Sequence, residues 1–282
     1  MTRKSLKEKI PAPDSLDEIQ EKLAPFTEDP AATAVFFDLD GTLAAIKPKP
    51  EAVTLPQEVA RLIRKIEHRY LAVTVVSGRP ATAAKRIVGN SQLAYIGNHG
   101  FETMLPGRTL VVTPEAQPYI GVVRELLKYV RSLPDMVDSG IMLEDKTVTL
   151  SFHYRRAPDP DRARALIQEK LIPKIEELGL VAREGRKVLE VRPPVPIDKG
   201  VAVGRLLDQL GAMKAIYAGD DTTDIDALKE LAKRKRRKHN FMAGIGVISD
   251  EMPAELPRYC DLLVDRLSGM ELVLQILADE EL

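Results

Sequence analysis

The strongest constraint on this sequence is a repeated alternation of short apolar segments with amphipathic ones. The segments between the apolar runs have helical spacing, and in residues 56–69 the apolar side chains fall on one helical face. Strands that alternate with helices predict an α/β fold built on a doubly wound parallel sheet. The apolar runs typical of buried strands are 34–37, 71–76, 93–96, 214–218 and 245–248.

The middle of the chain departs from this alternation. Val148, Leu150 and Phe152 alternate with polar residues, which is typical of a strand with one buried face. The expected helices are 119–133 and 160–178, and the expected strands are 141–146, 147–154 and 187–191. This pattern predicts a small α+β domain inserted into the larger one. The expected organisation is an N-terminal arm (1–30), a core (31–114 and 195–282) and an inserted domain (115–194).

Acidic residues gather at the predicted ends of two strands. Asp38 and Asp40 lie in the segment Asp-Leu-Asp-Gly-Thr, two positions apart, so they face the same way while the strand continues. A surface turn is the alternative interpretation, because Asp and Gly are common after strands. A second acidic cluster at 219–224 also follows an apolar strand. Two acidic strand ends at one edge of a sheet favour a site for a hard cation such as Mg²⁺.

The overall charge argues against several functions. Lys and Arg number 41 and Asp and Glu number 42, so the net charge of -1 does not favour nucleic acid or an anionic membrane. The basic run at 233–238 is interpreted as a solvated helix end and loop. The single cysteine, and the absence of a signal peptide or of an apolar run of about 18 residues, favour a cytoplasmic protein.

Four segments together resemble the haloacid dehalogenase superfamily of phosphohydrolases. They are Asp38 to Thr42, Ser77, Lys199 at the start of a helix, and Gly-Asp-Asp-x-x-Asp at 219–224, in the order found in that superfamily. The resemblance implies a Rossmann-like core, a larger mobile cap as the inserted domain, and a reaction through an aspartyl phosphate.

The same resemblance implies a role for each matching residue. Asp38 would be the nucleophile, and Asp40 would protonate the leaving oxygen and later activate water. The implied phosphate-binding residues are Thr42, Ser77, Gly78 and Lys199. The implied Mg²⁺ ligands are Asp38, the backbone carbonyl of Asp40, and Asp220, with Asp221 and Asp224 binding through water or holding neighbouring groups.

Segments of the inserted domain narrow the resemblance to trehalose-6-phosphate phosphatases. These segments are 143–146, 151–155 and 185–193, and the core segments 77–79 and 98–100 fit the same family. The implied substrate is trehalose 6-phosphate. The implied sugar-binding residues are Glu144, Lys146, Arg186 and Glu190, with Lys187 as the alternative to Arg186. Cross-strand ion pairs on the cap sheet are the competing interpretation of Glu144, Lys146 and Glu190.

Two other functions stay open at this point. One is a phosphatase for a different substrate, such as a hexose phosphate or a mannosyl- or glucosyl-glycerate phosphate. The other is a non-catalytic sensor of sugar phosphates, against which the Asp38 and Asp40 pair argues. The expected partner is a small sugar phosphate, with no nucleic acid and no membrane, and the sequence does not indicate a protein partner.

Overall fold

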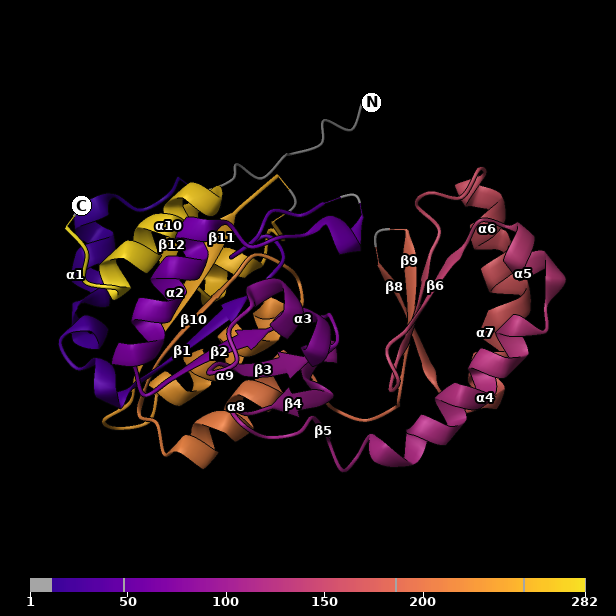
Figure 1. The fold of residues 1–282 in the computed structure, drawn as a ribbon, viewed down its shortest axis with the longest axis horizontal. Helices are drawn as coiled ribbons and strands as arrows, with labels where there is room; N and C mark the ends of the chain where they lie inside the picture. The colour runs from indigo at the N-terminus through magenta and orange to yellow at the C-terminus, as the bar shows by residue number, and fades with distance from the viewer. Residues whose placement is uncertain (1–11, 48, 186, 251, 282) are drawn as a thin grey trace, which may run out of the picture. The chain divides into compact units, whose positions relative to one another are not determined.

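A computed structural model describes residues 12–281 of the chain, except residues 48, 186 and 251. The described residues divide into two compact units (Figure 1). The first contains the residues up to Leu110 and those from Ile197 onward, and the second is Val111–Pro196. The first unit holds a mostly parallel sheet and the second holds a separate antiparallel sheet. The predicted fold class, an α/β core with an inserted α+β unit, is confirmed.

The larger sheet has the strand order β12-β11-β10-β1-β2-β3-β4-β5, in which β5 is Val111–Val112. Neighbouring strands from β12 to β3 run parallel, and β4 pairs antiparallel with β3. The order reverses at β1, from which the chain continues first to β2 and later to β10. Ligands bind at such a switch point, beyond the carboxyl ends of the strands. The strands are β1 (Thr33–Asp38), β2 (Ala72–Val76), β3 (Ala94–Gly97), β4 (Glu102–Met104), β10 (Lys214–Gly219), β11 (Phe241–Ile248) and β12 (Leu262–Asp265).

Helices cover both faces of this sheet because its strands are apolar on both sides. In β1, Val35 and Phe37 belong to one buried cluster, and Ala34 and Phe36 belong to another. The first cluster includes α1 (Leu16–Thr27), α2 (Gln57–Arg69), α3 (Ala81–Val88) and α10 (Arg266–Leu277). The second includes α8 (Lys199–Leu210) and α9 (Asp224–Lys235).

The N-terminal segment differs from its predicted description as an arm. Ser15 caps α1 and forms a capping box with Glu18, so the helix begins where this local signal is strongest. Ile19, Leu23 and Phe26 are buried in the first cluster. The short amphipathic helix that the sequence allows at 15–23 is therefore present and continues to Thr27, and it packs on the core, unlike a loosely attached arm. Residues 1–11 lie outside the described part of the chain.

The second unit packs helices on one face of a four-stranded antiparallel sheet with the order β6-β7-β9-β8. Its expected helix at 160–178 is interrupted by a π-helical turn, Ile167–Leu171, that lies just before Pro173. Proline has no N–H to donate, which accounts for the break. The elements are β5 (Val111–Val112), α4 (Ile120–Arg131), α5 (Pro134–Asp138), β6 (Met142–Asp145), β7 (Leu150–His153), α6 (Pro160–Leu166), α7 (Ile172–Glu177), β8 (Val181–Gly185) and β9 (Val188–Arg192).

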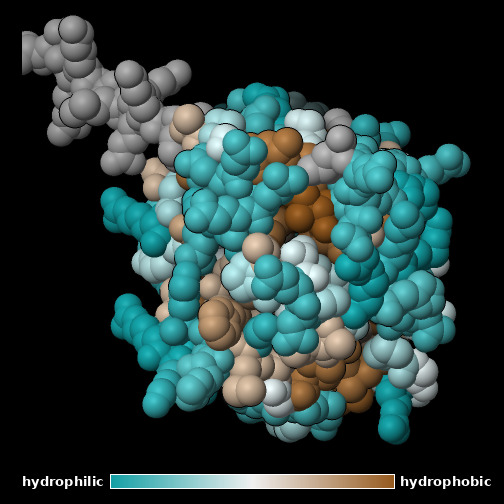
Figure 2. Space-filling view, turned by 90° about the vertical axis from the view of Figure 1, so that its left-hand side faces the viewer, coloured by the Kyte–Doolittle hydropathy of each residue, from teal (hydrophilic) through white to brown (hydrophobic). Residues whose placement is uncertain are grey.

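The surface of the first unit is mostly hydrophilic on the side of α1 and α10, with a few small apolar areas (Figure 2). None of the helices in the described residues has the length and apolar character needed to cross a membrane.

The basic run at 233–238, which was expected to be solvated throughout, contains one buried residue. Arg234 is buried and binds Asp208 and the carbonyl of Gly204, so it joins α9 to α8.

Candidate active site

Strand register brings the first acidic pair and the second acidic cluster together. Asp38 ends β1, and Phe37 is paired with Ala218 of β10, so Gly219 and Asp220 follow directly beside it. On the other side Asp38 is paired with Val76 of β2, which places Ser77 next to it. The three segments predicted to meet at the carboxyl edge of the sheet do meet there.

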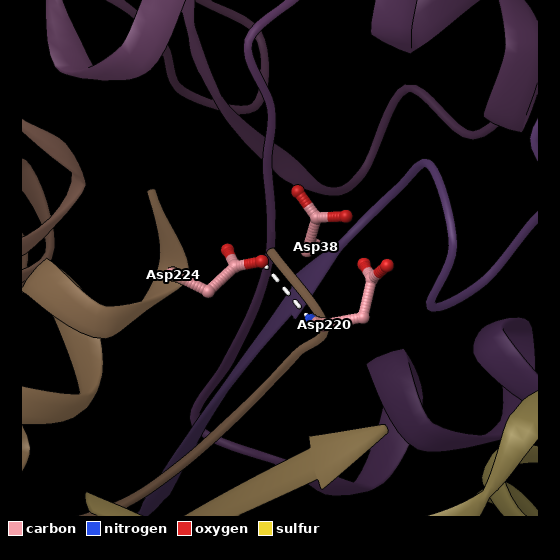
Figure 3. A group of neighbouring side chains, drawn as sticks. All are labelled: Asp38, Asp220 and Asp224. Carbon is pink, nitrogen blue, oxygen red and sulfur yellow. Dashed lines mark hydrogen bonds between the residues drawn. The ribbon is translucent and has the colours of Figure 1, made fainter. Parts of the chain in front are cut away.

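Three buried carboxylates form the centre of the site. Oxygen atoms of Asp38, Asp220 and Asp224 all lie within 4.8 Å of one another. In Figure 3 the Asp38 and Asp220 carboxylates point to the same side, and the Asp224 carboxylate reaches toward them from the start of α9. Carboxylates this close repel one another, and each needs a cation or a proton. The surface-turn interpretation of Asp38 does not fit a buried residue in such a cluster.

Gly41 allows the loop after β1 to lie directly against the Asp220 carboxylate. Gly41 has a φ of +100°, and a Cβ atom built on it would lie 2.2 Å from Oδ2 of Asp220. Any other residue would face both an unfavourable backbone conformation and a collision with that carboxylate. The neighbouring Thr42 is also directed at Asp220, because its Oγ1 donates to Oδ1 at 3.3 Å. The loop after β1 is therefore fitted to the second acidic cluster.

Lys199 is the positive group of the site. It is buried, and its Nζ lies 2.6 Å from Oδ1 of Asp38 and 2.6 Å from Oδ1 of Asp224. Burial alone would lower the pKa of this ammonium group, but the charges of Asp224 and Asp38 outweigh it and raise the pKa. Lys199 thus stays charged although it opens α8, where a cation opposes the helix dipole.

The carboxylate of Asp224 accepts hydrogen bonds from several groups of the site. Its Oδ1 accepts the Tyr217 hydroxyl at 2.5 Å in addition to Lys199. Its Oδ2 accepts the backbone N–H groups of Asp220 at 3.1 Å and Asp221 at 2.9 Å. Four donors therefore hold this carboxylate, which orients both the lysine and the loop that carries Asp220. Asp221 itself is exposed.

Tyr217 is a site residue that sequence reasoning did not identify. It lies in β10 and is fully buried, and its hydroxyl contacts Asp224. Burial, followed by the charges of Asp224 and Asp38, raises the pKa of this hydroxyl well above its usual value. A tyrosine inside an otherwise apolar strand, two residues before an acidic loop, is the signal that could have indicated it, because a buried hydroxyl needs a partner.

The carboxylates carry more negative charge than Lys199 neutralises. Burial, followed by the charge of Asp224, raises the pKa of Asp38 well above its usual value. Burial, followed by the charges of Asp224 and Asp221, raises the pKa of Asp220 to about 7. Three buried carboxylates and one ammonium group leave an excess of negative charge that a divalent cation would offset. Their oxygen atoms are the donors that a hard cation prefers, so the residues fit a metal site.

Asp40, two residues after Asp38, pairs with a residue from the loop after β2. Arg79 donates from Nε to Oδ2 of Asp40 at 2.6 Å and from Nη2 to Oδ1 at 2.7 Å. The same loop carries Ser77, which is buried and whose Oγ accepts the N–H of Arg79 at 3.1 Å. Gly78 lies against the imidazole ring of His99. No sequence signal indicated the contact between Arg79 and Asp40.

The residues expected to bind sugar lie in the second unit, and three of them, Glu144, Lys146 and Glu190, form a connected row of charges. Glu144 is paired with Ser151, which is paired with Glu190. Nζ of Lys146 lies 3.8 Å from Glu144 and 3.5 Å from Glu190. Nε of Arg192 donates to Glu190 at 2.7 Å, and His153 lies 3.0 Å from Glu144.

The sequence left two interpretations of Glu144, Lys146 and Glu190, which are sugar binding and cross-strand ion pairing, and these contacts can be compared with both. Cross-strand ion pairs are present, and Lys146 and Glu190 are nevertheless mostly buried. Lys187 is exposed in the turn between β8 and β9, with a φ of 58°. Arg186 lies outside the described residues, so the choice between Arg186 and Lys187 stays a prediction.

The first unit has the fold of the haloacid dehalogenase-like hydrolases, and its buried carboxylates lie at the carboxyl edge of the sheet. A "haloacid dehalogenase-like hydrolase" from Bacteroides thetaiotaomicron has a similar structure over 86% of this chain and 98% of that one, at 14% identity and a TM-score of 0.59. The profile of the trehalose-phosphatase family matches residues 36–255. The chain belongs to the trehalose-phosphatase family.

Individual relatives agree with this assignment. The chain is 29% identical to "Probable trehalose-phosphate phosphatase H" of Arabidopsis thaliana, covering 86% of this chain and 71% of that protein. It is 31% identical to "Probable trehalose-phosphate phosphatase 4" of Oryza sativa subsp. japonica, covering 78% and 59% respectively. The structure of the C-terminal domain of the C. albicans trehalose-6-phosphate phosphatase has a similar fold, with a TM-score of 0.70, 20% identity, and coverage of 98% of this chain and 100% of that one.

Proposed function

We propose that this chain hydrolyses trehalose 6-phosphate to trehalose and phosphate through an aspartyl phosphate on Asp38. The observation that carries the proposal is the buried Asp38 at the end of β1, which contacts Lys199 and lies beside Asp220. The trehalose-phosphatase family match supports the choice of substrate. The chain spans 59–71% of the length of the two curated relatives compared above, so their activity comes to it as part of this proposal.

The reaction divides into two steps at Asp38. In the first, the Asp38 carboxylate attacks phosphorus, the bond to the sugar oxygen breaks, and Asp40 gives that oxygen a proton. In the second, Asp40 takes a proton from water as the water attacks the phosphoryl group and releases Asp38. Lys199 offsets charge on the nucleophile and on the phosphoryl oxygens. Thr42, Ser77 and the backbone near Gly78 supply hydrogen-bond donors to those oxygens.

Asp38, the backbone carbonyl of Asp40, and Asp220 would hold Mg²⁺. When bound, the cation would neutralise phosphoryl charge beside the nucleophile. Asp224 has a different task in the proposal. Four donors already bind the Asp224 carboxylate, so Asp224 would orient Lys199 and the loop that carries Asp220.

The second unit would supply recognition of the sugar. A disaccharide offers many hydroxyl groups and no charge apart from its phosphate, and carboxylates and ammonium groups bind hydroxyls well. Glu144, Lys146 and Glu190 offer both kinds of group in one connected row. Arg186 or Lys187 would add a further cation. The ion pairs within the row would keep these side chains in place before the sugar arrives.

Phosphate release from a panel of sugar phosphates tests the proposal. The panel contains trehalose 6-phosphate, glucose 6-phosphate and a glucosyl-glycerate phosphate, each with Mg²⁺ and with a chelator. We expect release from trehalose 6-phosphate with Mg²⁺, none with the chelator, and none from Asp38→Asn. If phosphate is released from another sugar phosphate and not from trehalose 6-phosphate, that other ester is the substrate. If no member of the panel releases phosphate, the result favours a non-catalytic sensor of sugar phosphates.

A further inference from the structure

Arg79 holds the carboxylate of Asp40 in a side-on arrangement that uses both oxygen atoms. Two parallel bonds fix the plane of a carboxylate as well as its position. We propose that Arg79 is a positioning residue: it holds Asp40 in the orientation from which Asp40 passes a proton to the leaving oxygen and takes one from water. The inference rests on the aspartyl-phosphate reaction proposed above.

Arg79 is itself fixed at three points. Its Nη1 donates to the carbonyl of Pro50 at 2.9 Å, on the side of the guanidinium group away from Asp40. Its backbone N–H donates to Oγ of Ser77, and its carbonyl accepts the N–H of Asn98 at 2.7 Å. Both the side chain and the backbone of Arg79 are therefore held, so the guanidinium group has little freedom to follow a moving Asp40.

A buried carboxylate ties this loop to the next one. Oε2 of Glu102, in β4, accepts the N–H of Ala81 at 3.0 Å, and Oε1 accepts Nδ2 of Asn98 at 3.3 Å. Asn98 and His99 both have positive φ, at 54° and 56°. Non-glycine residues keep such a conformation only where surrounding contacts enforce it. The loop that carries Arg79 is thus part of a rigid frame built from the ends of β2 and β3.

The arrangement leaves Asp40 able to work. A carboxylate has about four lone-pair sites, of which Arg79 uses two, so the others can carry a proton or accept one from water. Arginine has no acceptor atom and stays protonated, so Arg79 cannot replace Asp40 in either step. Its contribution is made through the orientation of Asp40. A positioned acid or base contributes about 10²–10⁴-fold to a reaction, which sets the upper limit of that contribution.

The leaving group provides a test that general damage to the site cannot imitate. A sugar alkoxide needs a proton as it leaves, whereas para-nitrophenolate leaves without one. We expect Arg79→Lys and Arg79→Gln to lower kcat/KM for trehalose 6-phosphate by about 100-fold. The same variants should lower kcat/KM for para-nitrophenyl phosphate by less than about threefold. Equal losses on both esters would overturn the inference, since they would indicate that Arg79 binds the phosphoryl group directly or only supports the fold.

A double-mutant cycle gives a second reading that does not depend on the size of either single effect. If Arg79 acts through Asp40, adding Arg79→Gln to Asp40→Asn should cost nothing further on trehalose 6-phosphate. A further tenfold loss in the double variant would contradict the inference. Arg164→Lys is the matched control, because Arg164 binds Glu184 side-on in the same way on an exposed surface, and it should leave both activities unchanged.

Asp38→Asn separates this inference from the reaction on which it rests. If Asp38→Asn retains activity on both esters, the aspartyl-phosphate reaction is wrong. If Asp38→Asn is inactive on both esters but the Arg79 variants lose activity equally on the two, only the role of Arg79 is wrong. If trehalose 6-phosphate is not hydrolysed, the comparison is made with the sugar phosphate from the panel that is.

Discussion

At the scale of single residues, the site depends on buried polar groups that hold one another. Asp38, Asp224, Lys199 and Tyr217 are all buried and form one hydrogen-bonded network. In such a network a group that loses its partner is costly, because it then lies in a low-dielectric interior with no water to replace the bond. Changes of one atom should therefore be measurable in both stability and activity.

Tyr217→Phe removes one hydroxyl from this network. We expect a loss of about 1–3 kcal/mol in the free energy of unfolding, because Asp224 loses a donor in a buried place. Activity should fall about tenfold, since Asp224 also orients Lys199. Denaturant unfolding and phosphatase assays measure the two effects. Tyr95→Phe is the control: the Tyr95 hydroxyl donates to the carbonyl of Asn90 at 2.5 Å, so its loss should cost stability without affecting activity.

Gly41→Ala places a methyl group where the Asp220 carboxylate lies. We expect activity to be lost, because Asp220 must move away from its position beside Asp38. The positive φ adds a stability cost of about 1–2 kcal/mol. Gly107→Ala separates the two effects, since Gly107 also has a positive φ, of +66°, but a Cβ atom there meets nothing within 4 Å. Full activity in Gly41→Ala would show that the Asp220 position is not needed.

At the scale of elements, helices α8 and α9 carry Lys199 and Asp224 and pack closely together. A Cβ atom at Gly200 would lie 2.3 Å from the carbonyl oxygen of Asp226. Arg234 adds a tie between the two helices through Asp208 and Gly204. The helix pair thus sets the distance between a cation and a carboxylate of the site.

Gly200→Ala should push these helices apart at the end that carries the site. We expect a stability loss of about 1–3 kcal/mol from overpacking and a clear fall in activity, because Lys199 is the adjacent residue. Gly204→Ala, one turn further along α8, is the control. Its added Cβ atom would meet side-chain atoms of Glu230 and Arg234, at 3.1 and 3.2 Å, and no backbone atom that close, so activity should stay near normal. Similar activity in the two variants would contradict the role given to helix spacing.

The sequence predicts these elements unevenly, for physical reasons. The strand ends that carry Asp38 and Asp220 are predicted well, because long apolar runs followed by acidic loops leave little choice of structure. Arg79 and Tyr217 were missed as site residues. Their contacts with Asp40 and Asp224 depend on how side chains pack in the folded protein, and the spacing of residues in the sequence does not predict that packing. The strands β8 and β12 were also missed, because β8 is largely exposed and β12 is only four residues long, so neither carries a long apolar pattern.

At the scale of the whole molecule, chemistry and recognition are assigned to different units. The groups proposed to react all lie in the first unit, and those proposed to bind sugar lie in the second. Each unit has its own buried apolar cluster, so a change on the surface of one should leave the fold of the other intact. The two tasks should therefore be separable by mutation.

Lys146→Ala should separate them. We expect KM for trehalose 6-phosphate to rise by about tenfold or more, because a charged hydrogen bond to the sugar is lost. Turnover of para-nitrophenyl phosphate, which carries no sugar, should be unchanged. Lys170→Ala, which removes an exposed cation of the same unit paired with Glu169, is the control for a general charge effect. An equal loss on both esters would contradict sugar recognition by this row.

Direct detection of the phosphorylated enzyme tests the central claim that Asp38 is the nucleophile. The variant Asp40→Asn should react with para-nitrophenyl phosphate but hydrolyse the intermediate slowly, since the group that activates water is gone. We expect a single burst of para-nitrophenolate per enzyme molecule. After rapid acid quenching, mass spectrometry should find a phosphoryl group on the peptide that contains Asp38. Continued turnover without any adduct, or an adduct on a different residue, would contradict the account.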